Sequence, residues 1–352
     1  MFFRKKKETI GIDIGSSSIK VIQLTESDGR YTLHKFGLDV LAPEIIVDGT
    51  VMDSVRCVET IQKLINDQDI STKDVVISVS GHSVIIKRVT LPQMSEDELA
   101  ESIKWEAEQY IPFDINEVNM DFQILRTFMG ADGKQQMNVL LAAVKKDKLS
   151  DYTSLIVEAG LTPVIVDIDA FAIENMYNIN YEMKENEIIA LVNIGAGITN
   201  INILQGGVFA FTRDISIGGN RYTDSIQKDL GLSFEDAERI KKGEAVEGVE
   251  TLEVDSIIEN VSTEITSEIT RSFGYFKATM SSEKIDKVFL SGGSSKIRNL
   301  DSFLQERLEL PVEYINPFKM IDIPPQFDEG YIKRIAPFAA VAVGLGVRRL
   351  DD

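Results

Sequence analysis

The chain is poor in the residues that build covalent or metal-bound frameworks. Among its 352 residues it has one cysteine, Cys57, and two well separated histidines, His34 and His82. A single cysteine excludes an internal disulfide framework and a cysteine-rich metal site, and two isolated histidines argue against a His-based zinc centre. We interpret both histidines as ordinary structural or surface residues.

Long apolar runs and positive charge are also scarce. No stretch approaches the roughly 20 apolar residues of a membrane-spanning helix, and no signal-peptide core follows the basic start at residues 1–7. With 37 basic and 56 acidic residues the net charge is −19, which disfavours broad binding to nucleic-acid phosphates. We therefore expect a cytoplasmic protein with no transmembrane segment and no nucleic-acid partner. The Phe-Phe-Arg-Lys-Lys-Lys start could touch an anionic membrane weakly, but a solvated terminus is the simpler interpretation.

An internal repeat is the most informative feature present. A strand at 9–15 breaks at a glycine and is followed by strands at 19–24 and 31–40, and the same order recurs at 188–195, 199–204 and 208–217. The two copies align without a gap, so that Asp13 matches Asn193, Gly15 matches Gly195, Ser17 matches Gly197 and Lys20 matches Asn200. One Gly-rich turn alone would be an ordinary β-turn. Two such turns in register predict related domains with a shared function.

The chemistry of the first turn favours a phosphate ligand. Asp13 ends a strand, and Gly15 permits a tight turn whose amide groups can point at an anion. Hydroxyl donors come from Ser16, Ser17 and Ser18, and Lys20 adds a positive charge at the same end of the hairpin. A carboxylate beside a triphosphate requires a cation, so Asp13 is expected to hold Mg²⁺ through water molecules.

Residues 83–161 read as a small α+β unit inserted into the first domain. A capping box at Ser95 predicts a helix that Pro112 closes, strands are expected at 120–128 and 137–144, and a further helix ends at Gly160. The second half has helices at 234–242, 254–280 and from about 296, and a strand at 287–290. A small-residue helix at 335–345 either packs tightly against its neighbours or lies at a hinge between domains.

These motifs resemble those of the actin-like ATPase superfamily. Residues 10–20 and 193–199 are similar to its two phosphate loops, 288–294 to its adenosine motif, and 217–220 with 237–241 to the segment that contacts ribose and adenine in bacterial actins. The resemblance implies ATP and Mg²⁺ as ligands. It implies nucleotide-binding roles for Asp13, Gly15, Ser16, Ser17, Ser18, Lys20, Asn193, Gly195, Gly197, Thr199, Gly218, Gly219, Asn220, Glu238, Lys241, Gly292, Gly293 and Ser294.

The implied fold is α/β and actin-like, with two related ribonuclease-H-like domains flanking a nucleotide cleft and an FtsA-type α+β subdomain inserted in the first domain. Subdomain 1A is expected at 1–82, 162–185 and 333–352, and the inserted subdomain 1C at 83–161. Subdomain 2A is expected at 186–217 and 284–332, and subdomain 2B at 218–283.

The insert narrows the resemblance to the cell-division FtsA proteins and the PilM family of type IV pilus assembly proteins. The start of the chain and residues 105–113 (Trp-Glu-Ala-Glu-Gln-Tyr-Ile-Pro-Phe) are similar to PilM. That resemblance implies a cytoplasmic ATP-binding scaffold, peripheral to the inner membrane through its partners. The implied partners are the N-terminal peptide of PilN, in a groove between subdomains 1A and 1C beside 84–91 or 95–110, and other pilus motor or platform proteins.

The second phosphate loop departs from many relatives, because Asn193 stands where they have aspartate. An amide can hydrogen-bond a phosphate, but it is neutral and a poor proton acceptor. Asp167 and Asp169 are the candidates to orient an attacking water, although one of them, Asp169 in particular, could simply cap the helix that follows. The hypothesis is tight ATP binding with slow or absent hydrolysis. A sugar kinase and an FtsA-like filament former are the alternatives.

Overall fold

The computed structural model describes residues 8–279 and 284–350 of the chain. It divides into two compact units, a main unit of Met1–Ser78 with Leu155–Asp352 and an inserted unit of Val79–Ser154. The expected insert at 83–161 overlaps the second unit, and helix α3 (Lys146–Glu158) runs from one unit into the other.

The first sheet of the main unit has six strands in the order β10-β6-β1-β2-β3-β16. β1 pairs antiparallel with β2 and parallel with β6. The β1–β2–β3 meander is the first copy of the repeat, and its strands agree with the sequence prediction to within a few residues. The strands are β1 (Ile10–Ile14), β2 (Ser18–Ser27), β3 (Arg30–Val40), β6 (Asp74–Val79), β10 (Thr162–Ile168) and β16 (Ile321–Asp322).

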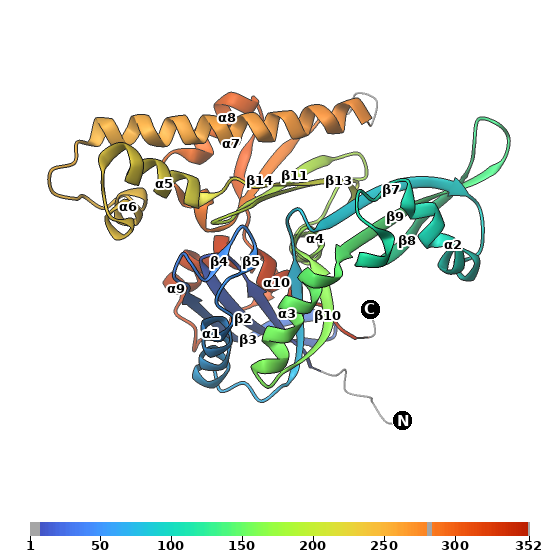
Figure 1. Cartoon of the computed structure of the whole chain (residues 1–352), viewed down its shortest axis with the longest axis horizontal. Helices are drawn as coiled ribbons and strands as arrows, with labels where there is room; N and C mark the ends of the chain where they lie inside the picture. Colours follow the sequence, from blue (N-terminus) through green and yellow to red (C-terminus); the bar gives the residue numbers. More distant parts are fainter. Residues whose placement is uncertain (1–7, 280–283, 351–352) are drawn as a thin grey trace. The chain divides into compact units, whose positions relative to one another are not determined.

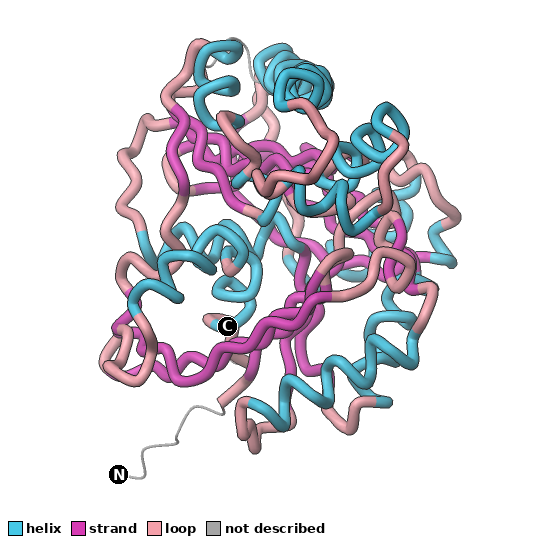
Figure 2. Tube along the Cα trace, turned by 90° about the vertical axis from the view of Figure 1, so that its left-hand side faces the viewer, coloured by secondary structure: helices cyan, strands magenta, loops and turns pink. Residues whose placement is uncertain are grey.

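The second sheet repeats this arrangement in the order β13-β12-β11-β14-β15. β11 pairs antiparallel with β12 and parallel with β14, as β1 does with β2 and β6. The strands of the second sheet therefore correspond, in the order given, to β3, β2, β1, β6 and β10 of the first. Figure 2 shows the two sheets as separate groups of strands with helices beside them. The predicted duplication is therefore confirmed in the topology. The strands are β11 (Ile188–Ile194), β12 (Thr199–Gln205), β13 (Val208–Ile215), β14 (Lys287–Ser291) and β15 (Val312–Tyr314).

Strand β11 lies between two hydrophobic cores because its apolar side chains alternate between the faces of the sheet. Ile189 and Leu191 pack into the core that includes the first sheet and helices α4 and α10. Ala190 and Val192 pack into the core under helices α5 to α8. The helices of the main unit, drawn in Figure 1, are α1 (Ser54–Asp67), α4 (Asp169–Asn180), α5 (Gly219–Leu230), α6 (Phe234–Lys241), α7 (Thr251–Thr279), α8 (Leu300–Leu308), α9 (Glu329–Ile335) and α10 (Ala340–Gly346).

The small residues near the C-terminus serve close packing. A side chain at Gly344 would overlap the Ala172 carbonyl in α4, and one at Gly346 would lie 2.8 Å from a methyl of Ile22 in β2. The packing alternative for the small-residue helix is thus the one that the structure supports. The helix itself is shorter than predicted, since a 3₁₀ turn, η3 (Ala336–Phe338), separates α9 from α10.

Two other predictions need correction or fall outside the described residues. The helix expected from about Lys296 begins at Leu300, because a 3₁₀ turn, η2 (Gly293–Lys296), comes first. The long helix expected to reach Met280 is observed to Thr279, and Met280 lies outside the described residues. Two short strands, β4 (Ile46–Val47) and β5 (Thr50–Val51), and helix α5 were not predicted.

The inserted unit contains a three-stranded sheet in the order β7-β9-β8. Helix α2 packs on it through Leu99, Ile103 and Ala107. The predicted capping box is present, with the Ser95 side chain accepting from the Glu98 amide and the Glu98 carboxylate accepting from the Ser95 amide. The elements are β7 (Val84–Pro92), α2 (Glu96–Glu108), η1 (Ile115–Glu117), β8 (Val118–Met129), β9 (Gln135–Lys145) and the start of α3. Across both units, no helix in the described ranges is long and apolar enough to cross a membrane.

Candidate nucleotide site

The first Gly-rich turn joins β1 to β2 and is closed by a hydrogen bond from the Gly15 amide to the Ser18 carbonyl at 3.1 Å. The Ser17 carbonyl accepts from Leu41 at 2.9 Å, which fixes the outer side of the turn. In the described part of the chain the amides of Ser16 and Ser17 donate to no protein atom. Consecutive unpaired amides in a tight turn form an anion-binding concavity.

The carboxylate and the ammonium group at the base of this turn pair with each other. Asp13 and Lys20 face each other across β1 and β2, with 3.1 Å between Lys20 Nζ and Asp13 Oδ2. Both residues are buried, so neither charge is well solvated. A phosphate group entering here would meet one ammonium whose charge is already partly balanced.

The second Gly-rich turn has the same closure, from the Gly195 amide to the Ile198 carbonyl at 2.9 Å. The amides of Ala196 and Gly197 are likewise without a protein acceptor among the described residues. A Cβ added to Gly197 would lie 3.1 Å from Ser16 Oγ, so the two turns face each other closely. The structure therefore brings together the two loops that the sequence predicted 180 residues apart.

The first turn of α5 packs onto the second loop. The amides of Gly219 and Asn220 donate to the Gly195 and Ala196 carbonyls at 2.9 and 2.8 Å. A side chain at Gly218 would come within 2.6 Å of both carbonyls, which explains a glycine there. The predicted segment 218–220 thus supports the loop and positions a helix N-terminus beside it.

The predicted adenosine motif, residues 288–294, packs against the second Gly-rich loop. Ser294 Oγ donates to the Gly195 carbonyl at 2.9 Å, and the Gly292 amide donates to the Pro337 carbonyl at 2.7 Å. Gly292 has φ +87 and approaches the Ile194 backbone closely, so that position requires glycine. Gly293 lies against the ring of Phe338. All three residues of the motif are therefore part of one tightly packed turn.

Glu238 and Lys241 of α6 form an ion pair beside α5. Lys241 Nζ also donates to the Thr223 hydroxyl at 2.8 Å and to the Gly219 carbonyl at 3.3 Å. Burial opposes ionisation of Glu238, but the attraction of Lys241 and the hydrogen bonds from Lys241 and Thr223 hold the pKa of this carboxyl below its usual value. The pair is thus anchored to the helix that carries Gly219. Thr223 was not predicted as part of this site.

Thr199 and Asn193 occupy different places in the second loop. Thr199 is fully buried and its hydroxyl donates to the Ile217 carbonyl at 2.7 Å, so it ties β12 to the segment before α5. Asn193 is half-buried and its amide nitrogen donates to Asn200 Oδ1 at 2.9 Å. Asn200 faces Asn193 in the register in which Lys20 faces Asp13.

Asp167 and Asp169 are separated by the structure rather than aligned on one strand face. Asp167 is the next-to-last residue of β10, and its carboxylate lies 3.2 Å from Arg348 Nε. Burial raises the pKa of Asp167, against the opposing effects of Arg348 and of the Ile168 amide. Asp169 is the first residue of α4, whose N-cap is Ile168 and has no side-chain cap, so the prediction that Asp169 caps the helix is wrong.

Asp169 is the one of the two that is bonded to the strand beside β1. Its Oδ1 accepts a hydrogen bond from the Ser78 hydroxyl at 2.6 Å. Ser78 follows Ile77, which pairs with Ile12 in the neighbouring parallel strand, so Ser78 lies beside the end of β1 that carries Asp13. The pairing of β6 with β1 is the information from which the position of Ser78 near this site could have been predicted.

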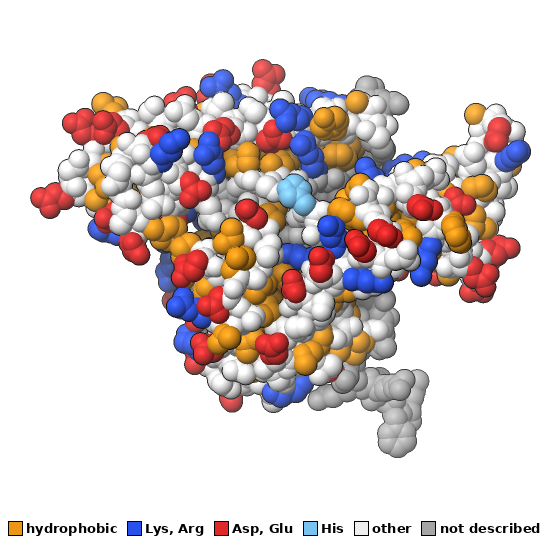
Figure 3. Space-filling view, viewed as in Figure 1, with side chains coloured by type: hydrophobic (Ala, Val, Ile, Leu, Met, Phe, Trp, Pro, Cys, Tyr) orange, Lys and Arg blue, Asp and Glu red, His pale blue; other side chains and the backbone are white. Residues whose placement is uncertain are grey.

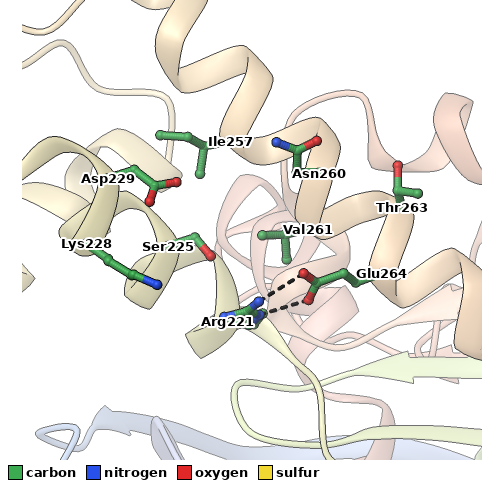
Figure 4. Close-up of a pocket in the computed structure, with 9 residues that line it drawn as sticks. All are labelled: Arg221, Ser225, Lys228, Asp229, Ile257, Asn260, Val261, Thr263 and Glu264. Atoms are coloured by element: carbon green, nitrogen blue, oxygen red, sulfur yellow. Dashed lines mark hydrogen bonds and ion pairs between the residues drawn. The ribbon is translucent and has the colours of Figure 1, made fainter.

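A separate hollow lies between α5 and α7, outside the predicted residues. Figure 4 shows Arg221 facing Glu264 there, with hydrogen bonds of 2.8 and 2.9 Å between the two side chains. The pair balances its own charge, and the hollow shares no residue with the loops described above. Figure 3 shows acidic and basic side chains interspersed over the visible face.

A metal ion would have few direct protein ligands. Within residues 8–279 and 284–350 no group of three or more His, Cys, Asp or Glu side chains could hold one. The single carboxylate of Asp13 therefore suits only a cation that is bound mainly through water and phosphate oxygens, as Mg²⁺ is in nucleotide sites.

Comparison with known proteins identifies the family. The profile described as type IV pilus assembly protein PilM matches residues 11–350. The chain belongs to the PilM family. A solved PilM structure, described as the PilM-PilN type IV pilus biogenesis complex, is similar at a TM-score of 0.85 and 27% identity, covering 97% of this chain and 98% of that one.

More distant relatives agree on the fold. The cell division protein FtsA of Bacillus subtilis is 25% identical over 255 residues, and FtsA of Streptococcus pneumoniae is 25% identical over 283 residues. The matches cover 66% and 73% of this chain, which spans only 57% and 61% of those proteins' length. The ethanolamine utilization protein EutJ of Carboxydothermus hydrogenoformans matches at a TM-score of 0.57 and 14% identity over 97% of this chain and 89% of EutJ. The fold of this PilM-family chain is actin-like with two domains, as predicted.

Proposed function

We propose that this PilM-family protein binds ATP between its two Gly-rich loops and hydrolyses it slowly or not at all. The observation that supports this most is that the two loops approach closely and that four of their amides, those of Ser16 and Ser17 in one loop and of Ala196 and Gly197 in the other, have no acceptor among the described residues. Backbone amides that are free in tight turns favour a phosphate group. Lys20 supplies a positive charge, and Asp13 would hold Mg²⁺ through water.

Slow hydrolysis follows from the residues near the second loop. Asn193 is a neutral amide and cannot accept a proton from an attacking water. Asp167 is paired with Arg348, and Asp169 accepts from Ser78. In this proposal Asp169 is the better placed of the two candidates for orienting water, since its partner Ser78 lies beside the end of β1 that carries Asp13. The nucleotide would act mainly as a clamp between the two domains.

ATP binding is tested by thermal unfolding and by single-turnover kinetics. A ligand that binds only the native state raises the unfolding temperature, so Mg·ATP and Mg·ADP should both raise it, while Gly197→Val should abolish the effect by closing the space beside Ser16. Gly274→Val, at an exposed glycine of α7 with no atom within 4 Å of its added Cβ, controls for glycine loss elsewhere. Absence of any shift would refute nucleotide binding. Rapid phosphate release in a single turnover would refute the clamp.

We propose further that the protein works in the cytoplasm as a scaffold of the inner-membrane platform for type IV pili. Family membership supports the pilus role, and the solved relative is a PilM-PilN complex. The partner would be the N-terminal cytoplasmic peptide of a PilN protein, docked on the inserted unit beside β7 or α2. Other motor or platform proteins would assemble on the same scaffold.

The single tryptophan offers a direct test of the docking site. Trp105 lies in α2 of the inserted unit and is 79% exposed. A peptide that docks beside α2 should shift its emission to shorter wavelength, because the indole would leave water. A peptide with the same composition in scrambled order is the control. Calorimetry would then separate two negative results: binding without an emission change places the peptide elsewhere, for instance beside β7, whereas no binding heat rejects the PilN partnership.

A further inference from the structure

Four polar residues form one row across the second sheet. Ser291, Asn193, Asn200 and Asp214 face one another in register on β14, β11, β12 and β13, which are neighbours in that order. Ser291 and Asn200 are each only 2% exposed. Side chains that are directly opposite on adjacent strands lie on one face of the sheet, so the row is a continuous line.

The hydrogen bonds along the row all run in one direction. Ser291 Oγ donates to Asn193 Oδ1 at 3.1 Å, Asn193 Nδ2 donates to Asn200 Oδ1 at 2.9 Å, and Asn200 Nδ2 donates to Asp214 Oδ1 at 2.8 Å. An ionised carboxylate only accepts hydrogen bonds, whereas an amide side chain can turn either end toward a neighbour. Asp214 is therefore the group that decides the direction for both amides.

The direction determines what Asn193 can offer a ligand. Its oxygen is engaged by Ser291, and one hydrogen of its amide nitrogen is used by Asn200. The second hydrogen has no acceptor among the described residues. The second loop consequently presents a hydrogen-bond donor where the first loop has the carboxylate of Asp13.

We propose that Asp214 is a positioning residue that sets Asn193 as a phosphate donor and prevents the second loop from serving as a metal or proton acceptor site. This deepens the proposed ATP function and rests on it for the identity of the ligand. Asp214 could not be predicted from local sequence because it lies 21 positions beyond Asn193 (214 − 193) and two strands away. The duplicated register of β11 and β12 is the signal that leads to it.

A double-mutant cycle tests the direction of the row. In N193D the new carboxylate faces Asn200 Oδ1, and turning Asn200 would place that oxygen against Asp214, so one pair of acceptors meets in either orientation. In N193D/D214N the Asn200 amide can turn, so that the amide at position 214 donates to Asn200 and Asn200 donates to the carboxylate at position 193, while Ser291 donates to position 193 as before. We expect N193D to unfold at clearly lower urea concentration than the parent, D214N to change little, and the double variant to recover most of the loss.

N193D/D229N is the matched control, because Asp229 is exposed on α5 outside the row and its replacement changes the net charge equally. It should remain as unstable as N193D. Additive effects of N193D and D214N on stability would overturn the inference. The unfolding experiment needs no nucleotide, so its outcome is independent of whether the protein binds ATP.

Nucleotide affinity supplies a readout that a purely structural role would not change. In the parent, Asp13 in the first loop is the only one of these two matching residues with a carboxylate for Mg²⁺, so it alone sets how ATP affinity depends on Mg²⁺. In N193D/D214N the carboxylate lies in the loop itself, so the ratio of ATP affinities with and without Mg²⁺ should rise about tenfold. An unchanged ratio in a stable double variant that still binds ATP would overturn the positioning role. If the parent itself binds no ATP, the ATP proposal fails, and the stability cycle alone decides the direction of the row.

Discussion

Lys20 Nζ lies 3.1 Å from Asp13 Oδ2 at the base of the first loop, and both side chains are about nine-tenths buried. The equivalent facing pair in the second domain is Asn200 with Asn193, joined by a 2.9 Å hydrogen bond. The duplication has thus kept the position of the pair and changed its chemistry from charged to neutral. Since only the first loop has a pair of charged side chains at its base, the two loops should respond differently to mutation of these pairs.

Replacement of Lys20 should expose the cost of the charged pair. Lys20→Met leaves the Asp13 carboxylate buried without its cation, and breaking a buried pair from one side costs about 3 kcal/mol. We expect lower stability to urea and weaker ATP binding. Adding Asp13→Asn removes the second charge, so the double variant should regain stability without regaining ATP affinity. A Lys20→Met protein as stable as the parent would show that the pair contributes nothing.

Glu174 in α4 should make stability depend on pH. Its Oε2 and Asn202 Oδ1 are both buried without a hydrogen-bond partner among the described residues, and the two side chains are neighbours. Burial raises the pKa of Glu174 to about 7, a change opposed by Asn202 and the Phe209 amide and reinforced by the negative charge of Asp167. A proton on Glu174 would satisfy both oxygens. Glu174 should therefore be mostly protonated in the folded protein below neutral pH.

The sign of the effect follows from linkage. The folded state holds a proton that the unfolded state releases near the ordinary value of 4.5, so this contribution to stability is complete below that pH and is lost as pH rises to about 7. The span corresponds to roughly 3 kcal/mol. Urea unfolding at several pH values should show this loss in the parent and not in Glu174→Gln. Glu259→Gln, at an exposed site on α7, should retain the parental profile, and a matching profile in Glu174→Gln would contradict the assignment.

The sequence predicted the repeat, the loops and the capping box because each depends on local chemistry. Gly15 and Gly195 mark strand-ending turns, and Ser95 with Glu98 needs only three residues to form its cap. Alternating apolar residues were enough to find β11 and β12. These features survive in the structure because tertiary contacts reinforce the local preference.

Residues that act through contacts distant in sequence were not predictable in the same way. Arg348 neutralises Asp167 from 181 positions away (348 − 167), and no local pattern connects them. Helix α5 begins at Gly219 and Asn220, two residues of weak helix propensity, so the sequence does not predict a helix there. The helix start is stabilised instead by hydrogen bonds from these two amides to the second loop. Strand register, once known, is what places Ser78 beside the end of β1 and Asp214 in line with Asn193.

The Asp167–Arg348 pair should be structural. Arg348→Ala leaves a buried carboxylate without its cation, so we expect lower stability in urea, by about 3 kcal/mol at neutral pH. Arg348→Lys keeps the charge and should recover part of the loss. Asp167→Asn should leave ATP affinity unchanged, because Asp167 contacts neither loop directly among the described residues. A loss of ATP binding in a stably folded Asp167→Asn protein would show that Asp167 contributes to the nucleotide site and contradict this prediction.

The contact between Gly219 and Ser294 should control how tightly the second loop is held. A Cβ at Gly219 would overlap Ser294 Oγ and lie 3.0 Å from Ser294 Cβ, and that hydroxyl donates to the Gly195 carbonyl. Gly219→Ala should therefore lower stability and weaken ATP binding, since the loop must shift. Ser294→Ala alone should cost about 1 kcal/mol for the lost hydrogen bond.

Combining the two changes separates steric overlap from general loss of a glycine. With the hydroxyl removed, the added methyl at position 219 loses its overlap with Ser294 Oγ and keeps only a close 3.0 Å approach to Ser294 Cβ and an ordinary contact with the Gly195 carbonyl, so the double variant should be more stable than Gly219→Ala. Gly231→Ala, at the left-handed C-cap of α5 with φ 66, is the matched control, because its cost arises from backbone strain and Ser294→Ala should not relieve it. Urea unfolding and ATP titration of this series measure both effects. Equal relief of Gly219→Ala and Gly231→Ala by Ser294→Ala would mean that the overlap does not determine how the loop is held.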